Sequence, residues 1–271
     1  MSASTSHPPF VARRQLLLSD LPEVLLAELR QAAQSAYPRE CCGLIVDVAG
    51  QLSYWPCANI APVLAQAVCF VLAPTEWAAA EDAGTVLAVV HSHPDACANP
   101  SMADRLGCER TGLTWFIVGW PSAVVVALQP EGWQAPLVGR EFVFGVLDCY
   151  TLIQDYYRRV LSLTLPDFDR EDGFWETQRL ADGSVQKGRE LYLEGFAEAG
   201  FVEVTGQPQL HDVILMQVAS EVVNHGVVYI GDGLILHHLY GRLSCRDPYG
   251  GYWLRHSVKL LRHHSLVGSS A

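Results

Sequence analysis

Two histidines, a serine and an aspartate lie close together in the sequence, and their types are those of a metal site. His91 and His93 follow the apolar run 86–90, which predicts a strand. Positions i and i+2 of a strand face the same side, so both imidazoles are expected to converge. Ser101-Met-Ala-Asp104 predicts a helix start that adds a carboxylate. His91, His93 and Asp104 are therefore candidate ligands of a divalent metal with one coordination position open, as in catalytic zinc sites.

Each of these residues also has a simpler interpretation when it is taken alone. Ser101 and Asp104 have the spacing of a helix capping box, and capping is the favoured interpretation of that pair by itself. A lone histidine is more often a hydrogen-bonded core residue than a ligand. Neither explanation accounts for two histidines on one face directly before the cap. Cys97 lies in the same loop, but Asp104 completes the ligand set without it.

Glu40 is the candidate general base of this site. A metal-bound water needs a group to take its proton, and Glu40 precedes an apolar strand, where an isolated carboxylate is costly to bury. A surface carboxylate at the end of a strand is an equally good interpretation of this residue alone.

Together these residues resemble the JAB/MPN (JAMM) metalloprotease family over roughly residues 15–135. The matching motifs are His-Ser-His-Pro, then Ser101-x-x-Asp104, with Pro-x-Glu-x-Cys-Gly upstream. The resemblance implies an α/β sandwich of the cytidine-deaminase-like type that holds Zn²⁺ on His91, His93 and Asp104. It further implies that Glu40 is the general base and that Ser101 stabilises the oxyanion. Zinc would lower the pKa of its bound water to about 7 and polarise the scissile carbonyl.

Cys149 begins a second set of catalytic residue types. Apolar residues after it recur at helical spacing: Leu152, Ile153, Tyr156, Tyr157 and Val160. The thiol is therefore expected at a helix N-terminus, where the dipole and the free amides favour a thiolate. A buried, inert cysteine is the competing interpretation, and it is the starting assumption in a chain with eight cysteines.

Residues 221–240 predict a β-hairpin with strands at 221–230 and 234–240 around the turn Gly231-Asp-Gly233. His225 would be the base paired with Cys149, and a histidine on the return strand would orient it. A three-residue loop places His237 on the face of His225. A two-residue turn places His238 there instead, because a slip of one residue exchanges the two faces. The hairpin pattern alone leaves both open.

The second set resembles the NlpC/P60 family of papain-like cysteine peptidases. The matching pieces are Asp148-Cys149, His211-Asp212 before a strand, and His225-Gly-Val-Val-Tyr-Ile-Gly. The family's interval from base to third polar residue selects His237. The resemblance implies a papain-like α+β domain with Cys149, His225 and His237 as nucleophile, base and orienting residue.

Two features depart from the NlpC/P60 pattern. The family commonly has a small residue after the cysteine, whereas this chain has Tyr150. The family also has a tyrosine in a longer glycine-containing loop upstream, whereas Phe142 and Phe144 stand in a short loop here. A tyrosine hydroxyl that would donate to the oxyanion is therefore missing from that loop.

The chain has 271 residues, of which 50% are hydrophobic and 17% charged, which suits two domains with a packed core each. We expect an α+β protein of two domains. The predicted parts are a flexible N-terminus at 1–14, a JAB/MPN-like domain at 15–135, an NlpC/P60-like domain at 138–254 and a C-terminal tail at 255–271.

Further elements are expected from pattern and turn residues. Helices are predicted at 20–33 and 74–82, and strands at 42–48, 52–56, 67–72, 114–118 and 123–128. The polar-aromatic stretch 165–176 is expected as a loop beside the cleft, and the locally basic C-terminus as a solvated face.

Charge and cysteine usage exclude several classes of function. A formal net charge of −11 argues against a nucleic-acid-binding protein. No apolar run reaches the length of a membrane span, and residues 15–18 are too short for the core of a signal peptide. Eight cysteines without a signal sequence or a Cys-x-x-Cys pair predict reduced thiols and argue against a zinc ribbon.

JAB/MPN followed by NlpC/P60 on one chain of this length resembles the arrangement in phage tail assembly proteins of the lambda K type. The resemblance implies a tail-tip component made in the host cytoplasm, with other tail proteins as partners. A particle that carries the protein to the wall would explain a wall peptidase without an export signal. The C-terminal half would cleave peptidoglycan stem peptides, and the N-terminal half would be a zinc-dependent peptidase or isopeptidase. The alternative is a structural assembly factor whose two sites are relics.

Overall fold

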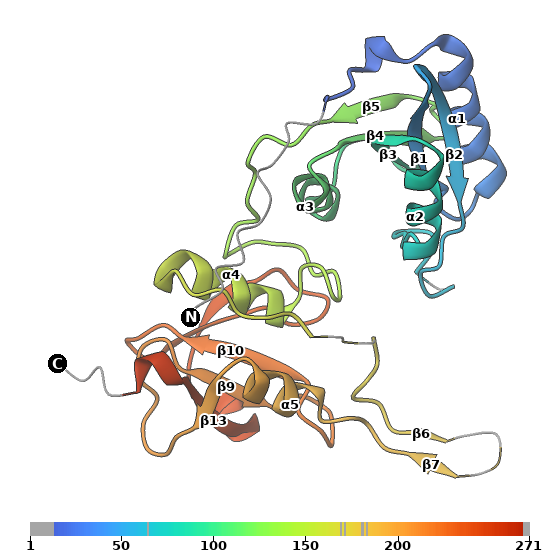
Figure 1. Ribbon diagram of the computed structural model, residues 1–271. Helices are drawn as coiled ribbons and strands as arrows, with labels where there is room; N and C mark the ends of the chain where they lie inside the picture. The colour runs from blue at the N-terminus through green and yellow to red at the C-terminus, as the bar shows by residue number, and fades with distance from the viewer. Residues whose placement is uncertain are drawn as a thin grey trace. The chain divides into compact units, whose positions relative to one another are not determined.

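The structure is a computed structural model that describes residues 14–63, 65–168, 170, 172–179, 182 and 184–267 (Figure 1). The chain forms two compact units, Met1–Gln134 and Ala135–Ala271. Each unit has its own sheet, helices and hydrophobic core, which confirms the expected α+β class with two domains. No helix in the described part is long and apolar enough to cross a membrane. The N-terminus predicted at 1–14 lies outside the described residues, except for Arg14.

The first unit contains a five-stranded sheet of order β2-β1-β3-β4-β5. Its strands are β1 (Cys42–Val48), β2 (Gln51–Cys57), β3 (Thr85–Pro94), β4 (Thr114–Trp120) and β5 (Val125–Leu128). Only β3 and β4 pair in parallel among these neighbours, and the connection between them contains a helix. A parallel pair requires such a crossover, which returns the chain to the same end of the sheet.

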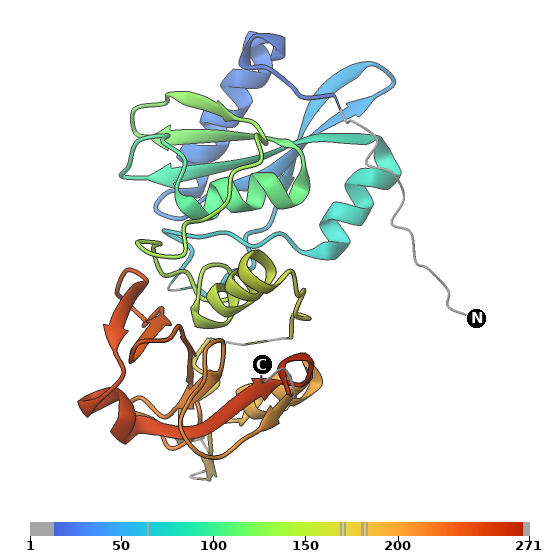
Figure 2. The ribbon, with the colours of Figure 1, turned by 90° about the vertical axis from the view of Figure 1, so that its left-hand side faces the viewer.

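Helices cover both faces of this sheet (Figure 2). They are α1 (Glu23–Ala36), α2 (Pro74–Ala83) and α3 (Met102–Thr111), after a short 3-10 turn, η1 (Leu18–Asp20). Leu29 of α1 belongs to a cluster with Phe116 on one face. Ala80 of α2 belongs to a cluster with Trp115 on the other, where α3 also packs. The C-terminal end of β3 therefore lies in a sheet covered on both sides.

The strand expected at 67–72 is wrong. Only an isolated bridge joins Leu72 to Asn59 there. The Asn59 side chain explains the difference, because it satisfies backbone groups that a strand partner would otherwise take. Its Nδ2 donates to the carbonyl of Cys69 (3.1 Å), and its Oδ1 accepts from the amides of Ala61 (3.0 Å) and Val71 (3.2 Å).

The second unit contains a six-stranded sheet of order β12-β11-β10-β9-β13-β8, in which all paired neighbours are antiparallel. The strands are β8 (Phe201–Glu203), β9 (Val213–Met216), β10 (His225–Tyr229), β11 (Leu234–His237), β12 (Cys245–Pro248) and β13 (Ser257–His263). A separate two-stranded ribbon is formed by β6 (Gln178–Arg179) and β7 (Val185–Gln186).

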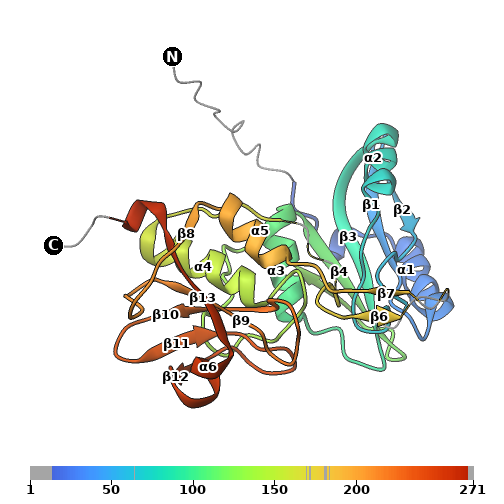
Figure 3. The ribbon, with the colours of Figure 1, turned by 90° about the horizontal axis from the view of Figure 1, so that it is seen from below.

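Helices α4 (Cys149–Leu161) and α5 (Leu191–Glu198) lie on one side of this sheet (Figure 3), and α6 (Gly251–His256) precedes β13. A last 3-10 turn, η2, spans His264–Leu266. Leu152 of α4 and Phe196 of α5 share the main cluster with Val228. Trp253 of α6 packs with Val227 in a smaller cluster. Because neighbouring residues of β10 point to opposite faces, the two clusters lie on opposite sides of the sheet.

Two boundaries in this unit differ from expectation. Strand β10 begins at His225, four residues later than the predicted strand at 221–230. The assignment of 255–271 to a tail is wrong, because β13 lies between β9 and β8 within the sheet. Basic residues obscured this strand in the sequence, and their charges are paired. Arg262 contacts Asp212 (2.7 and 2.8 Å), and Lys259 contacts Glu203 (2.8 Å).

Candidate active sites

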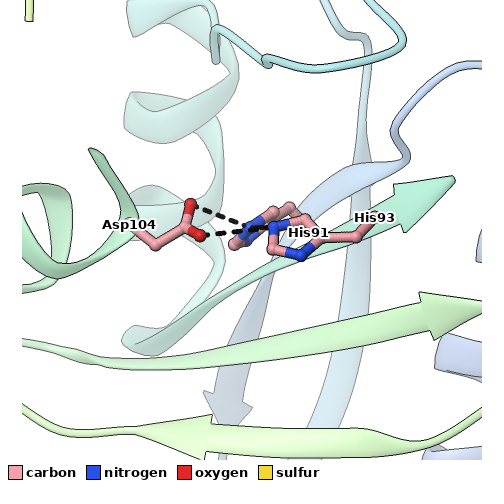
Figure 4. Close-up of side chains that lie close together, drawn as sticks. All are labelled: His91, His93 and Asp104. Carbon is pink, nitrogen blue, oxygen red and sulfur yellow. Dashed lines mark hydrogen bonds and ion pairs between the residues drawn. The ribbon is translucent and has the colours of Figure 1, made fainter. Parts of the chain in front are cut away.

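Three predicted ligands converge in the first unit (Figure 4). His91 Nε2 lies 3.1 Å from Asp104 Oδ1, and His93 Nε2 lies 3.2 Å from Asp104 Oδ2. The two Nε2 atoms are 3.1 Å apart. Strand β3 extends through Pro94, so both histidines are part of the strand and share a face.

The start of α3 holds the carboxylate in place. Asp104 Oδ2 accepts a hydrogen bond from the Ser101 amide (2.7 Å), and Ser101 Oγ accepts from the Asp104 amide (3.1 Å). The capping box and the convergence on the histidines therefore occur together. The Ser101 hydroxyl proton remains available to a further acceptor, because a hydroxyl can accept and donate at once.

These atoms have the spacing of a tetrahedral metal site. Zinc bonds of about 2.0 Å to nitrogen and oxygen place neighbouring ligand atoms roughly 3.3 Å apart, close to the 3.1–3.2 Å observed. Burial lowers the pKa of His91, so its ring stays neutral and has a lone pair to donate. Burial alone would raise the pKa of Asp104, but its contacts with His91 and His93 hold that pKa well below its usual range. The donor set thus fits a divalent cation.

Neighbouring groups fix the two imidazoles. His93 Nδ1 lies 3.0 Å from the carbonyl of Cys97, which places its proton on Nδ1 and leaves Nε2 free as a ligand atom. The Cys97 side chain is exposed, and its sulfur is not part of the converging group. The His91 ring stacks on Phe70 with centroids 4.7 Å apart and meets the edge of Trp115 at 5.5 Å. These aromatic rings exclude water from one side of the group.

Glu40 is buried, with 5% of its surface exposed, and lies two residues before β1. Burial raises the pKa of Glu40 to about 8, an effect that His93 opposes and Asp104 reinforces. The charges of the ligand group therefore act on this carboxyl. Strand pairing brings the two segments together: the Cys41 amide donates to Ser92 Oγ (2.8 Å), and Cys42 pairs with His91.

Cys149 is the first residue of α4, as expected. Asp148 caps the helix by accepting from the Thr151 amide (2.8 Å). The Cys149 side chain is buried (3% exposed), and its Sγ lies 3.1 Å from Tyr192 Oη. Burial, followed by the Asp148 charge, raises the pKa of the thiol to about 11, and contacts with Tyr192 and the Gly226 amide oppose this only in part. The helix N-terminus therefore does not produce a thiolate in this conformation.

The hairpin register places His237, not His238, on the face of His225. Tyr229 pairs with Ile235, and the Ile230 amide donates to Leu234 O (3.0 Å), so the loop consists of residues 231–233. All three loop residues have positive φ angles of 51–87°. The rings of His225 and His237 have centroids 5.6 Å apart. His238 faces the other side and lies near Phe142 (5.0 Å).

His225 is buried (3% exposed), and its Nε2 has no partner within the described residues. Among the described residues, no hydrogen bond joins Cys149 to a histidine. The Gly226 amide, which affects the thiol, nonetheless brings the start of β10 next to Cys149. Catalytic hydrogen bonds are often long without substrate and tighten only when it binds.

Two residues at this site were missed by sequence reasoning. Tyr192 of α5 supplies a hydroxyl at Cys149 Sγ, although the upstream loop has no tyrosine. Asp247 of β12 contacts His237 Nε2 with its Oδ2 at 3.2 Å. The pairing of β11 with β12 could have indicated Asp247, whereas nothing in the spacing of Tyr192 could.

The segment 162–176 packs over the start of α4 and accommodates Tyr150. The Tyr150 side chain is fully buried, and its hydroxyl donates to Pro166 O (2.5 Å). Arg170 lies over the Tyr150 ring and contacts Asp148 Oδ2 through its Nε (3.2 Å). The expected loop at 165–176 thus contacts helix α4, with residues 169 and 171 outside the described part.

Comparison with known proteins matches both units to families. Residues 22–136 match the prokaryotic homologs of the JAB domain, and residues 139–262 match the NlpC/P60 family. The tail tip assembly protein K of Escherichia phage N15 is 39% identical over 239 residues, which cover 88% of this chain and 94% of that protein. Its counterpart in Escherichia phage lambda is 35% identical over 200 residues, covering 73% and 92%. A solved JAB1/MPN domain protein from Archaeoglobus fulgidus is 23% identical and covers 41% of this chain and 88% of that chain, with a TM-score of 0.27.

Burial of His225 predicts acid sensitivity of the fold. Burial, with His237 and His238 adding to it, lowers the pKa of His225 from 6.5 to about 3. Below about pH 6.5 the unfolded chain binds a proton on this ring that the folded chain does not bind until about pH 3, so stability falls with pH in that window. Between about pH 7.5 and pH 5 the free energy of unfolding should therefore fall in both proteins. We expect the fall to be about 2 kcal/mol larger in the wild type than in His225→Phe.

Urea denaturation of both proteins across that range measures this difference. Between about pH 7.5 and pH 8.5 the difference between the two proteins should stay constant, since His225 is neutral in both states there. Parallel loss of stability from about pH 7.5 to pH 5 would contradict the burial of a neutral His225.

Proposed function

Because this chain belongs to the family of tail tip assembly proteins K, with a JAB unit followed by an NlpC/P60 unit, we propose that it is a tail-tip protein with two hydrolytic centres. The C-terminal unit is a thiol endopeptidase that cleaves peptidoglycan stem peptides during host entry. The N-terminal unit is a zinc-dependent peptidase or isopeptidase, and a tail protein is its substrate. The observation that carries the proposal is the convergence of His91, His93 and Asp104 at ligand spacing.

The thiol centre would act by covalent catalysis. Cys149 Sγ attacks the scissile carbonyl while His225 takes the thiol proton, and the same proton passes to the leaving amine as the thioester forms. Water then hydrolyses the thioester, again with His225 as base, and releases the acid and the free thiol. His237 orients His225 from the same face, and Asp247 holds His237 through Nε2.

The oxyanion of this reaction needs hydrogen-bond donors at the carbonyl oxygen. The start of α4 offers backbone amides next to Cys149, of which that of Thr151 is already bonded to Asp148. Tyr192 Oη, 3.1 Å from Sγ, is within reach of an oxygen on a carbon bonded to that sulfur. We therefore assign Tyr192 the donor role that the upstream loop cannot fill.

In the first unit, His91, His93 and Asp104 would hold Zn²⁺, which supplies a Lewis acid and a bound water of lowered pKa. Glu40 takes the proton of the attacking water on its carboxylate and returns it to the leaving amine. Ser101 Oγ, whose hydrogen is not needed for capping, donates to the oxyanion.

The second candidate function is a structural assembly factor with relic sites. The 3% exposure of Cys149 and its contact with Tyr192 in place of a histidine favour it. Complementation of a phage that lacks this gene separates the two functions. Full plaque formation by the combined Glu40→Gln and Cys149→Ala variant would support the structural role, and loss of infectivity with normal particle yield would support the enzymatic one.

Replacement of Cys149 tests the thiol centre. Purified wild-type protein should release peptide fragments from cell-wall sacculi, and Cys149→Ala should lower the rate by at least about a thousandfold, since the thioester cannot form. Cys69→Ser, which removes a thiol of the first unit, is the matched control and should retain activity. Equal fragment release by Cys149→Ala would rule out the thiol mechanism.

Replacement of Tyr192 by Phe tests the oxyanion donor. We expect kcat to fall about a hundredfold with a nearly unchanged KM, because the lost hydrogen bond acts on the transition state. Tyr157→Phe, which removes another buried hydroxyl that donates to a backbone carbonyl, is the control. If both variants keep the wild-type kcat, Tyr192 has only a packing role.

Zinc content tests the ligands of the first unit. The double variant His91→Ala and His93→Ala should contain one zinc ion fewer per chain than the wild type, since a single remaining carboxylate cannot hold the ion. The matched control is the double variant His256→Ala and His264→Ala, which removes one half-buried and one exposed histidine of the second unit. Elemental analysis after dialysis gives the stoichiometry, and an unchanged value in the first variant would remove this ligand assignment.

A further inference from the structure

His237, Cys245 and Asp247 form a second group of converging donor atoms, on strands β11 and β12 of the second unit. His237 pairs directly with Cys245 across the two strands. Asp247 is two residues further along β12, so its side chain emerges on the same face as that of Cys245. The strand register, and not a flexible loop, therefore brings the three side chains together.

The distances within this group are those of metal ligands. His237 Nε2 lies 3.2 Å from Asp247 Oδ2 and 3.4 Å from Cys245 Sγ. One ligand atom from each residue lies within 4.8 Å of the others. Zinc bonds of about 2.0 Å to nitrogen and oxygen and about 2.3 Å to sulfur give tetrahedral ligand separations of roughly 3.3–3.5 Å.

Trp253 contacts two of the three donor residues. Trp253 Nε1 donates to Asp247 Oδ2 (3.3 Å), and its ring meets His237 with centroids 4.4 Å apart. His237 is 2% exposed, and its Nδ1 has no hydrogen-bond partner within the described residues. The imidazole is thus packed against Trp253, with Nε2 directed at the carboxylate and the thiol.

We propose that His237, Cys245 and Asp247 bind a Zn²⁺ ion. A thiolate and an imidazole favour zinc over magnesium or calcium, whose sites use oxygen ligands. On binding, the Cys245 thiol releases its proton to solvent and the sulfur forms the metal bond. Cys245 and Asp247 are partly exposed, so the ion reaches the group from solvent and keeps a fourth position for water. The site goes beyond the proposed function and does not depend on hydrolysis, although it shares His237 with the thiol centre.

Cobalt substitution distinguishes this site from that of the first unit. Co²⁺ bound to a thiolate gives a charge-transfer band in the near ultraviolet, whereas the ligands His91, His93 and Asp104 contain no sulfur. Titration of metal-free full-length protein with Co²⁺ should produce this band, saturating at one equivalent of thiolate-bound ion per chain. Cys245→Ser should abolish the band, and Asp247→Asn should weaken the affinity read from it by more than about tenfold.

Cys97→Ser is the decisive control, because Cys97 is an exposed cysteine beside the ligands of the first unit. Its band should equal that of the wild type. The proposal is overturned if wild-type protein binds Co²⁺ without a thiolate band, or if the band survives Cys245→Ser; loss of the band in Cys97→Ser would then assign the thiolate to the first unit. Circular dichroism of Cys245→Ser separates loss of the ligand from loss of the fold, and zinc analysis should show one ion fewer per chain than in the wild type.

Discussion

A helix capping box positions candidate catalytic groups in both units. In α3 the box formed by Ser101 and Asp104 turns the carboxylate toward two imidazoles. In α4 the box formed by Asp148 and Thr151 fixes the first turn, where Cys149 stands. Side chains in a first turn are held by backbone hydrogen bonds that the helix needs in any case. The hydrogen bonds that form the helix therefore also offset the conformational entropy lost when these groups are oriented.

The same capping arrangement has opposite electrostatic effects in the two units. Asp104 faces histidines, which keep its carboxylate ionised and ready to bind a cation. Asp148 lies beside a thiol, and its charge adds to the burial that raises the pKa of Cys149. Arg170 and the Thr151 amide bind the Asp148 carboxylate, so its charge is kept within the unit. Burial leaves both the thiol and His225 neutral, so the proposed mechanism requires proton transfer from the thiol to His225 as the sulfur attacks.

Local pattern was sufficient for the parts of these sites that lie on one element. The apolar run before His91 and the spacing from Ser101 to Asp104 predicted a strand and a helix start, and the structure contains both. The hairpin histidine remained open because two turns fit Gly231-Asp-Gly233, and pairing of Tyr229 with Ile235 decides between them. Geometry places His237 with His225, while the catalytic roles of both stay predictions.

Contacts between distant segments could not be predicted in this way. Tyr192 reaches Cys149 because α4 and α5 pack on one core, and no spacing in the sequence encodes that. Strand β13 was hidden because Lys259 and Arg262 gave it the composition of a solvated surface, although both charges are paired within the unit. In each case the sequence shows the residue but does not show which distant residue it contacts.

The two roles assigned to His237 are chemically compatible, because an imidazole has two different nitrogens. Its Nε2 is the atom next to Asp247 and Cys245. An ion on Nε2 would place the ring proton on Nδ1, whereas a carboxylate that accepts a hydrogen bond from Nε2 keeps the proton on Nε2. Nδ1 is therefore a hydrogen-bond donor when the ion is bound and an acceptor when the carboxylate accepts from Nε2. His237 Nδ1 has no hydrogen-bond partner within the described residues, and its ring lies beside that of His225 with centroids 5.6 Å apart, so the occupant of Nε2 sets whether this free nitrogen can donate or accept.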